Sequence, residues 1–352
     1  MELDIQTFTV NKRFPLTISR GTTAQSTNVW VKLKQDGVEG WGEASPFSVG
    51  YSPQTAKILV EALTKISPKL LTLTPFDRQL IDILLTEYQL PSAAKTALDL
   101  AIYDWLGKKL GLPLWKLWGL NRDNIVPISV TIGINTPAGA QARVKDWIDY
   151  LNVRVLKVKL GSPDGIEADI AMLLAVKKVA PQDALLYVDA NGGWTLEEAI
   201  IMCDRLKSMG VEYIEQPLAA DITLEQLSQL YQQSPLPIFV DESCWTSQDI
   251  PKLAHCIDGI NIKLMKSGGL REALRMIHTA KAYGLKVMFG CYSDSCIANT
   301  AAAHLSPLAD YLDLDSHLNL VDDPFQGAEI RDGCLIPNDR PGLGVSLKSI
   351  SH

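Results

Sequence analysis

The chain has 352 residues, of which 47% are hydrophobic and 21% charged, and its formal net charge is −7. This acidic balance, without a basic tract, argues against nucleic acid and anionic membranes as partners, and no apolar run reaches the ~18 residues of a membrane-spanning helix. The chain does not open with a basic and then apolar segment as a signal peptide does. Its six cysteines include no Cys-x-x-Cys pair, so we expect a cytoplasmic protein with free thiols.

The first part of the chain, residues 1–123, predicts an α+β domain. Residues 2–10 alternate as a strand, and residues 28–34 and 38–43 predict a hairpin. We expect residues 14–27 and 44–52 to be mobile loops of the kind that contact ligands. Helical patterns follow at residues 53–66, 76–88 and 92–110.

In residues 124–316, short apolar runs alternate with helical patterns. Strands are predicted at residues 127–134, 155–160, 184–190, 211–215, 236–241, 259–264, 285–289 and 309–314. Helices are predicted between them, among others at residues 137–151, 165–179, 195–208 and 267–283. Alternation indicates parallel strands, and eight of them favour a closed α/β barrel, with a doubly wound open sheet as the competing architecture. Residues 317–352 are predicted to pack back on the N-terminal part.

One predicted strand, residues 155–160, carries two lysines. Because successive side chains of a strand point to opposite faces, Lys157 and Lys159 share one face and Leu156 and Val158 the other. If helices cover the apolar face, as in parallel sheets, the lysines point into the space that the sheet encloses. Two buried ammonium groups cost several kcal/mol each, so anionic groups should meet them.

Three other predicted strands end in acids at equal intervals of 26 residues, namely Asp189, Glu215 and Asp241. Catalytic groups of such barrels lie at the carboxyl ends of the strands, so these acids should converge at one mouth. Carboxylate oxygens at that density favour a hard cation, and Mg²⁺ leaves positions for water or substrate. The alternative is that each acid caps the helix after its strand.

A third lysine, Lys263, ends the sixth predicted strand, across the mouth from Lys159. A divalent ion and two facing lysines suit the removal of an α-proton from a carboxylate through an enediolate, with one lysine taking the proton and the other returning one on the opposite face. Each base needs a lowered pKa, which positive neighbours would favour. Lys157, one pleat deeper, is expected to give electrostatic support.

These features resemble the muconate-lactonizing subgroup of the enolase superfamily: the Lys-x-Lys strand, the Asp/Glu/Asp series, and the run Asn261-Ile-Lys-Leu-Met-Lys-Ser-Gly-Gly269. The resemblance implies a modified (β/α)₇β TIM barrel with an N-terminal α+β capping domain, often as a homo-oligomer. It also implies one Mg²⁺ per subunit, with Mn²⁺ as a substitute, and Lys or His bases of the kind known for this superfamily. Asn191 and Glu242, beside two of the acids, are expected to support the metal site.

The last predicted strand ends in Asp313-x-Asp315, which resembles the signature of dipeptide epimerases, where the acid pair holds the ammonium of the substrate. This implies epimerisation of the second residue of Ala-Xaa dipeptides, because two inward carboxylates would repel the uncharged or anionic groups of other substrates. The alternative is that the acid pair neutralises the charge of the lysines or caps the bottom of the barrel.

The second residue of the dipeptide remains open between Glu and a small or hydrophobic residue such as Ala or Val. The resemblance places two covering loops, around Arg20 and around Tyr51, over the substrate, and Arg20 could pair with a γ-carboxylate. Ser293 and Asp294 are expected in the specificity pocket, although Asp294 departs from the family pattern there.

Two other activities remain in view. An o-succinylbenzoate synthase or muconate cycloisomerase would share the metal and the lysines, and Asp313 and Asp315 argue against it. A mandelate-racemase type is disfavoured because no histidine follows the sixth or seventh predicted strand at the mouth. A non-catalytic barrel that binds a metal or a peptide is the alternative of another class.

Overall fold

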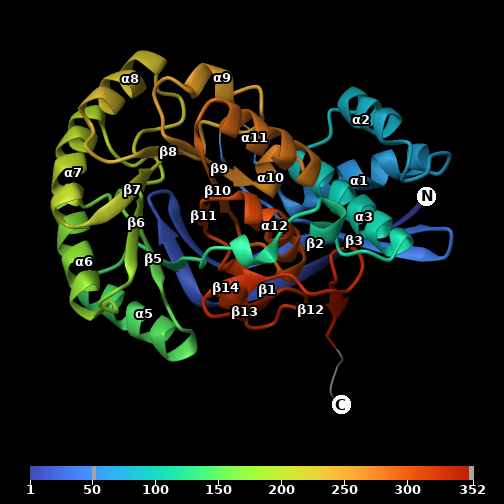
Figure 1. Cartoon of the computed structure of the whole chain (residues 1–352), viewed down its shortest axis with the longest axis horizontal. Helices are drawn as coiled ribbons and strands as arrows, with labels where there is room; N and C mark the ends of the chain where they lie inside the picture. The colour runs from blue at the N-terminus through green and yellow to red at the C-terminus, as the bar shows by residue number, and fades with distance from the viewer. Residues whose placement is uncertain (50–52, 349–352) are drawn as a thin grey trace.

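The computed structural model describes residues 1–49 and 53–348, and its centre is an eight-stranded parallel barrel (Figure 1). The strands follow each other in sequence order around the sheet. They are β4 (Val130–Ile132), β5 (Val155–Lys159), β6 (Leu185–Asp189), β7 (Val211–Glu215), β8 (Ile238–Val240), β9 (Gly259–Lys263), β10 (Lys286–Gly290) and β11 (Tyr311–Leu312). A parallel bridge between Ile128 and Leu312, with the Ser129 amide donating to the Leu312 carbonyl at 2.8 Å, closes the ring. The predicted barrel is confirmed over the open sheet.

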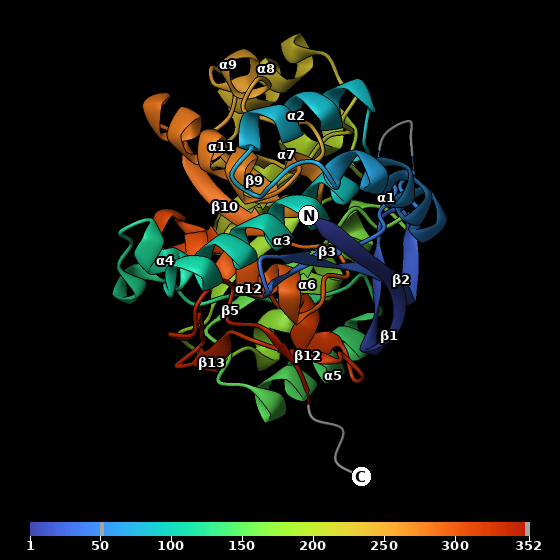
Figure 2. The same cartoon turned by 90° about the vertical axis from the view of Figure 1, so that its right-hand side faces the viewer.

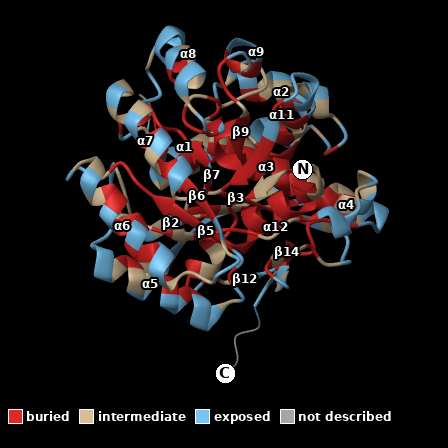
Figure 3. Ribbon diagram, turned by 60° about the vertical axis from the view of Figure 1, so that its left-hand side comes forward, coloured by how far each residue is buried: buried red, intermediate tan, exposed pale blue. Residues whose placement is uncertain are grey.

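The outer ring consists of the helices that return the chain to the next strand. They are α5 (Pro137–Tyr150), α6 (Ile166–Val179), α7 (Leu196–Ser208), α8 (Leu224–Gln233), α9 (Ile250–Leu253), α10 (Leu264–Ser267), α11 (Leu270–Ala282) and α12 (Cys296–Leu305). Capping boxes begin two of them, at Thr195 with Glu198 and at Thr223 with Gln226. Buried residues gather at the centre and exposed ones on the outer helix faces (Figure 3).

The lower interior of the barrel is an apolar plug. Its members come from alternate positions on the strands and are Val155, Tyr187, Tyr213, Phe239, Met288 and the partly buried Tyr311. The Tyr213 ring lies 4.5 Å from that of Phe239 and 4.9 Å from that of Tyr311, between centroids. Because this layer fills the bore, the barrel opens only toward the carboxyl ends of its strands.

An antiparallel sheet of β1 (Glu2–Ile18), β2 (Gly21–Gln35) and β3 (Val38–Ala44) begins the capping domain. The loop predicted at residues 14–27 is wrong, because β1 and β2 pair almost to their ends and leave a tight turn at Ser19-Arg20. The threonines there favour strand, and the hydroxyls of Thr17 and Thr22 lie 2.8 Å apart across the ladder. Gly21, at φ +134°, supplies a backbone conformation that other residues rarely adopt.

Helices α1 (Ala56–Leu70) and α3 (Ser92–Leu110) pack against this sheet, and α2 (Arg78–Glu87) lies farther out, where its Asp82 pairs with Arg271 of α11 (Figure 2). Helix α3 packs closely on β3 because two glycines face it. A Cβ at Gly40 would lie 2.0 Å from the Ala101 carbonyl oxygen, and one at Gly42 would lie 1.9 Å from that of Ala97. Short helices α4 (Leu114–Leu117) and η1 (Arg122–Asn124) lead into the barrel.

The C-terminal segment links both parts of the molecule. It contains η2 (Ser306–Leu308), η3 (Ser316–Asn319), β12 (Phe325–Gln326), β13 (Glu329–Arg331), β14 (Cys334–Ile336) and β15 (Ser346–Leu347). Asp322 accepts hydrogen bonds from the amide and the side chain of Asn11 at 2.7 and 2.6 Å. The Leu343 amide donates to Asp104 on α3 at 2.7 Å. These contacts fix the capping sheet over the barrel mouth.

Candidate active site

Lys157 lies fully buried at the centre of the barrel mouth. Its ammonium contacts Asp313 at 2.6 Å, Glu215 at 2.7 Å and Asp189 at 3.4 Å. Burial alone would lower the pKa of Lys157, but the three carboxylates raise it well above its usual value. The charged form of Lys157 is therefore favoured, and its electrostatic role stays a prediction.

Lys159 lies one pleat nearer the opening, and its ammonium donates to Asp189 at 2.6 Å. Burial would raise the pKa of Asp189, but Lys159 and Lys157 lower it to about 2. The amide of Asn191 donates to the second oxygen of Asp189 at 2.8 Å. Asn191 adopts φ +44°, a strained value for a residue with a side chain, and this turn aims its side chain back at the acid, as expected for a supporting residue.

On the opposite side of the mouth, Lys263 contacts Asp241 at 2.8 Å and lies 4.5 Å above the centre of the Tyr292 ring. Burial acts to lower the pKa of Lys263, but Asp241 and its neighbours raise it well above the usual value. The expectation of a lowered pKa is therefore not met for Lys263, because a carboxylate contacts its ammonium directly.

Sequence reasoning gave no role to Lys266, three residues after Lys263. Its fully buried ammonium donates to Asp241 Oδ1 at 2.6 Å, to the carbonyls of Cys244 and Asn261 at 3.0 and 3.3 Å, and also to the Asp241 carbonyl. Asp241 thus lies between two lysines, which hold its pKa far below the usual range against the effect of burial. A lysine one helical turn after a strand-end lysine was the available signal.

Glu215 depends on two further residues that the sequence did not indicate. The Asn261 side chain donates to Glu215 Oε1 at 2.7 Å. Gln216, at φ +38°, accepts from the amides of Asp241 and Ser243 at 2.8 and 3.2 Å and so joins the ends of β7 and β8. Burial first, and then Asp189, raises the pKa of Glu215 to about 7.

The three predicted ligands are gathered at one mouth, each held by ammonium groups. Among residues 1–49 and 53–348, no three His, Cys, Asp or Glu side chains are arranged as a metal centre. Glu215 Oε2 and Asp241 Oδ2 contact lysines at 2.7 and 2.8 Å but lack hydrogen-bond geometry, and buried oxygens of Asn191, Glu242 and Asn261 have no hydrogen-bond partner. This surplus of buried acceptors fits a hard divalent cation.

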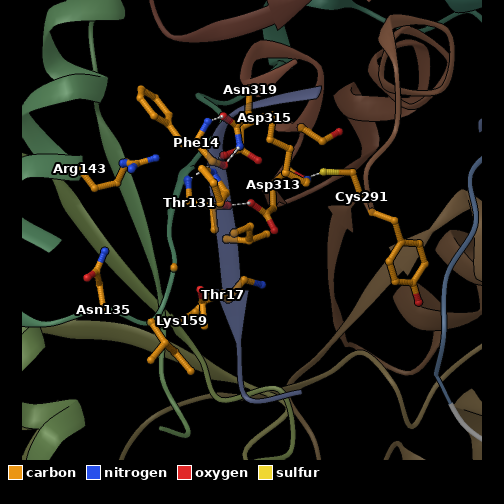
Figure 4. Close-up of a pocket in the computed structure, with 17 residues that line it drawn as sticks. Phe14, Thr17, Thr131, Asn135, Arg143, Lys159, Cys291, Asp313, Asp315 and Asn319 are labelled. Carbon is orange, nitrogen blue, oxygen red and sulfur yellow. Dashed lines mark hydrogen bonds between the residues drawn. The ribbon is translucent and has the colours of Figure 1, made fainter. Parts of the chain in front are cut away.

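Asp313 and Asp315, treated alike in the sequence, differ in their surroundings (Figure 4). Asp313 is bound to Lys157 and accepts from the Ser129 hydroxyl at 2.9 Å, and these charges hold its pKa down against burial. Asp315 accepts from the Thr131 amide at 2.7 Å but contacts no lysine within 4.0 Å in the described chain. Burial and the nearby Asp313 raise the pKa of Asp315 to about 6. The alternative interpretation, in which the acid pair neutralises the lysines, describes Asp313.

Arg20, at the tip of the β1–β2 hairpin, reaches across to the barrel. Its guanidinium donates to Glu242 at 2.7 Å and to the Asn191 carbonyl at 2.8 Å. Glu242 is the residue after Asp241, so the hairpin is tied to the end of β8, next to a predicted metal ligand. An arginine already neutralised in this way is less available to a substrate carboxylate than the sequence suggested.

Ser293 and Asp294, which the sequence predicted in the specificity pocket, follow β10 and lie in the interface between the barrel and the capping domain. Asp294 is buried, which raises its pKa, and its Oδ1 has no hydrogen-bond partner. The Ser293 carbonyl accepts from Asn28 at 2.8 Å. Glu43, which the sequence did not indicate, accepts from the Ser295 hydroxyl at 2.7 Å and from the amide of Ala298 at 3.1 Å, at the start of α12. Tyr51 lies outside the described residues.

Two connected cavities separate the capping sheet from the barrel mouth. The larger, of about 590 Å³, is lined by Arg20 and by both Lys159 and Lys263, with apolar walls from Leu16, Ile18, Phe47 and Val49. The smaller is lined by Thr131, Asp313 and Asp315 on the barrel side and by Phe14 and Thr17 on the capping side (Figure 4). Lys159 lies in the wall of both. Lysines from two opposite strands and an acid at one end therefore line the space between the capping sheet and the barrel.

A capped (β/α)₇β barrel with lysines on its second and sixth strands and acids on the third to fifth defines an enzyme class that acts on carbon acids. Residues 2–119 match the model of the mandelate racemase / muconate lactonizing enzyme N-terminal domain, and residues 139–350 that of the enolase C-terminal domain-like family. The chain belongs to this family within the enolase superfamily, as its sequence motifs indicated.

Curated relatives cover the whole chain. It is 44% identical over 349 residues to a hydrophobic dipeptide epimerase of a Flavobacteria bacterium, with 99% of both chains covered, and 43% identical over 350 residues to another of Roseobacter litoralis, again with 99% of both covered. A solved dipeptide epimerase of Enterococcus faecalis, complexed with Mg and the dipeptide L-Leu-L-Tyr, superposes with a TM-score of 0.90 at 31% identity, over 98% of this chain and 99% of the other. No helix in the described ranges is long and apolar enough to cross a membrane.

Proposed function

We propose that the protein is a Mg²⁺-dependent epimerase that inverts the α-carbon of the second residue of dipeptides. The observation that carries this proposal is the pair Lys159 and Lys263, which line one cavity from opposite sides of the barrel mouth. A planar carbon between them can lose a proton to one face and gain one from the other. Asp315, in the adjoining cavity, provides the anion for the dipeptide ammonium.

Asp189, Glu215 and Asp241 would hold the Mg²⁺, since all three are buried at adjacent strand ends, and Glu215 and Asp241 each carry a buried oxygen without a hydrogen-bond partner. A bound ion supplies positive charge beside the substrate carboxylate and so makes the α-proton more acidic. With Asp189 and Asp241 neutralised in this way, Lys159 and Lys263 would lose the attraction of the acids that they now contact. Both ammonium groups would then be free to turn toward the cavity, and the pKa of Lys263, which Asp241 now raises, would fall when this attraction is lost.

The chain's own residues perform the proton transfer. One lysine, in its neutral form, takes the proton from the α-carbon, and the facing lysine donates a proton from its ammonium to the opposite face of the same carbon. The lysines exchange protonation states, and solvent restores them before the next turnover. Lys157 stays charged throughout because Asp313 and Glu215 hold it, and it supports the negative charge that builds up nearby.

The second residue is hydrophobic rather than Glu. Arg20 donates to Glu242 and to the Asn191 carbonyl, so a substrate γ-carboxylate would have to displace both contacts. The cavity around it has apolar walls from Phe47, Val49 and Leu16. The names of two relatives above 40% identity, and the L-Leu-L-Tyr bound to the Enterococcus faecalis protein, support this choice.

A dipeptide library in ²H₂O tests the proposal. With Mg²⁺ present, we expect deuterium at the α-position of the second residue and formation of its epimer, fastest for hydrophobic second residues. Lys159→Ala and Lys263→Ala should each stop epimerisation, and Lys34→Ala, near the end of β2 with a half-exposed side chain, should not. Absence of exchange across the library with folded, Mg²⁺-loaded protein would refute the proposal and favour a synthase, a cycloisomerase or a non-catalytic barrel.

A further inference from the structure

Strand β1 carries one charge in an otherwise apolar stripe. Every second residue of this strand faces the barrel side and is less exposed than its neighbours, in the order Phe8, Val10, Lys12, Phe14 and Leu16. Such a stripe buries its members against the rest of the protein. A lysine in it loses hydration, and burial lowers the pKa of Lys12. A cation in this apolar stripe therefore requires an interaction that offsets its lost hydration.

Contacts of Lys12 with the other described residues do not supply this interaction. Within residues 1–49 and 53–348, the Lys12 ammonium makes no ion pair within 4.0 Å and no hydrogen bond, although Asp315 and Asp294 lie near enough to favour its charged form. Its side chain lines both cavities, at their junction. Lys12 therefore presents its ammonium to whatever occupies the space between the capping sheet and the barrel.

The remaining charges around the smaller cavity are largely matched. Asp313 is bound to Lys157, and Lys159 to Asp189. Arg143 lies 3.7 Å above the Phe14 ring and 3.5 Å from Asp146. Asp315, on the barrel wall, and Lys12, on the capping wall, are left facing the cavity without a partner of opposite charge within 4.0 Å in the described chain.

A ligand that carries both an ammonium and a second, anionic group would pair with Asp315 on the barrel wall and with Lys12 on the capping wall. In a dipeptide, the ammonium belongs to the first residue and is placed on Asp315, while the terminal carboxylate is needed at the metal. Because Lys12 shares the smaller cavity with Asp315, the anion that reaches it there is the side chain of the first residue. We propose that Lys12 selects the first residue of the substrate, favouring an acidic side chain, Glu or Asp, and rejecting a cationic one.

This inference rests on the proposed function and replaces the Ala expected from the sequence as the preferred first residue. A charge-assisted hydrogen bond in a partly dehydrated site gives about tenfold or more in discrimination. Bringing a like charge to an unpaired buried ammonium carries a penalty of similar size. The two effects act in opposite directions on Glu-Xaa and Lys-Xaa substrates, so their ratio is the sensitive quantity.

The test compares kcat/KM for L-Glu-L-Leu, L-Ala-L-Leu and L-Lys-L-Leu, measured by deuterium uptake with saturating Mg²⁺. The natural chain should prefer the Glu substrate over the Lys substrate by about a hundredfold. Lys12→Met should reduce this ratio to about threefold or less, and Lys12→Glu should invert it. Lys34→Met, on the same sheet but with a half-exposed side chain, should leave the ratio unchanged.

A ratio within one preparation does not depend on the fraction of folded protein, so a destabilised variant still gives an answer. If Lys12→Met lowers kcat/KM equally for all three substrates, or if the natural chain shows no charge preference, the inference about Lys12 is wrong while the epimerase proposal stands. If none of the three substrates, nor any other dipeptide, exchanges its α-proton, the proposed function itself fails.

Discussion

The two layers inside the barrel differ in whether the chain completes their interactions. In the lower layer, Tyr187, Tyr213 and Phe239 pack against each other and leave no space. In the upper layer, lysines contact acids directly, yet buried acceptor oxygens of Glu242 and Asn261 remain without hydrogen-bond partners. Both layers are built from alternate positions on the same strands. The lower layer thus serves stability, and the upper layer keeps unsatisfied groups that a ligand must complete.

The largest effect on stability is expected at Lys266, which joins the upper layer to the fold. Lys266→Met removes the partner of Asp241 Oδ1 and of three carbonyls. Breaking a buried pair by deleting one partner costs about 3–5 kcal/mol. Chemical denaturation of the variant without Mg²⁺ measures this loss, and added Mg²⁺ should restore part of it by neutralising Asp241. An unchanged midpoint would show that Asp241 does not need Lys266.

A buried histidine outside the barrel interior extends the comparison of completed and incomplete interactions, because its own hydrogen-bonding interactions are complete. His304 accepts from the Trp115 amide and contacts the Leu343 carbonyl, both at 3.1 Å. Burial lowers the pKa of His304 to about 4. The unfolded chain binds this proton below a pH of about 6.5 and the folded chain does not, so the stabilisation is present above pH 6.5 and is lost as the pH falls toward 4.

The loss amounts to about 3 kcal/mol for this residue alone. Urea titrations between pH 4 and pH 7 should show a steeper decline for the natural chain than for His304→Gln, which carries no titrating group. His317, whose pKa burial also lowers to about 4, contributes equally in both proteins. Parallel pH profiles would contradict the assignment.

Mg²⁺ should stabilise the upper layer and leave the lower one unaffected. At a concentration of 100 Kd, a ligand that binds only the folded state adds about 2.7 kcal/mol. The Mg²⁺-induced rise in Tm should disappear in Asp241→Asn and persist in Tyr213→Phe, where only the contact of the hydroxyl with the Met288 sulfur at 3.3 Å is lost. A rise that survives in Asp241→Asn would place the ion elsewhere.

The smallest effect is expected at the rim of the mouth. Arg20 is 40% exposed, so its contact with Glu242 is screened by solvent. Arg20→Met should change the free energy of unfolding by less than about 1 kcal/mol. A loss of several kcal/mol in denaturation experiments would show that the hairpin tip supports the fold as strongly as the buried lysines do.

The sequence predicted the barrel because each strand has an uninterrupted apolar face, and β7 is predicted to the residue. It also predicted which side chains share the upper layer, because period-two alternation fixes Lys157 and Lys159 on one face. The extension of the β1–β2 hairpin to its tip was missed, since its polar threonines and serines have the composition of a loop and form a strand only through pairing across the hairpin. Local composition does not reveal such pairing.

The sequence also did not predict contacts between residues that lie far apart in the chain. The engagement of Asp313 by Lys157 and of Arg20 by Glu242 joins residues 156 and 222 positions apart, and the strand pattern alone does not specify these pairs. Glu43, Gln216 and Lys266 were missed for the same reason, because each is polar but its role depends on the element packed against it. Lys12 could have been noticed, since it interrupts an alternating apolar stripe.

The most direct test of the account follows the fate of each epimer in single-lysine variants. With a hydrophobic L,L- or L,D-dipeptide in ²H₂O and Mg²⁺, Lys159→Ala and Lys263→Ala should each lose epimerisation but exchange the α-proton of one epimer, and the exchanged epimer should differ between the two variants. This result requires one base on each face of the carbon. Exchange of the same epimer by both variants, or full epimerisation by either, would contradict it.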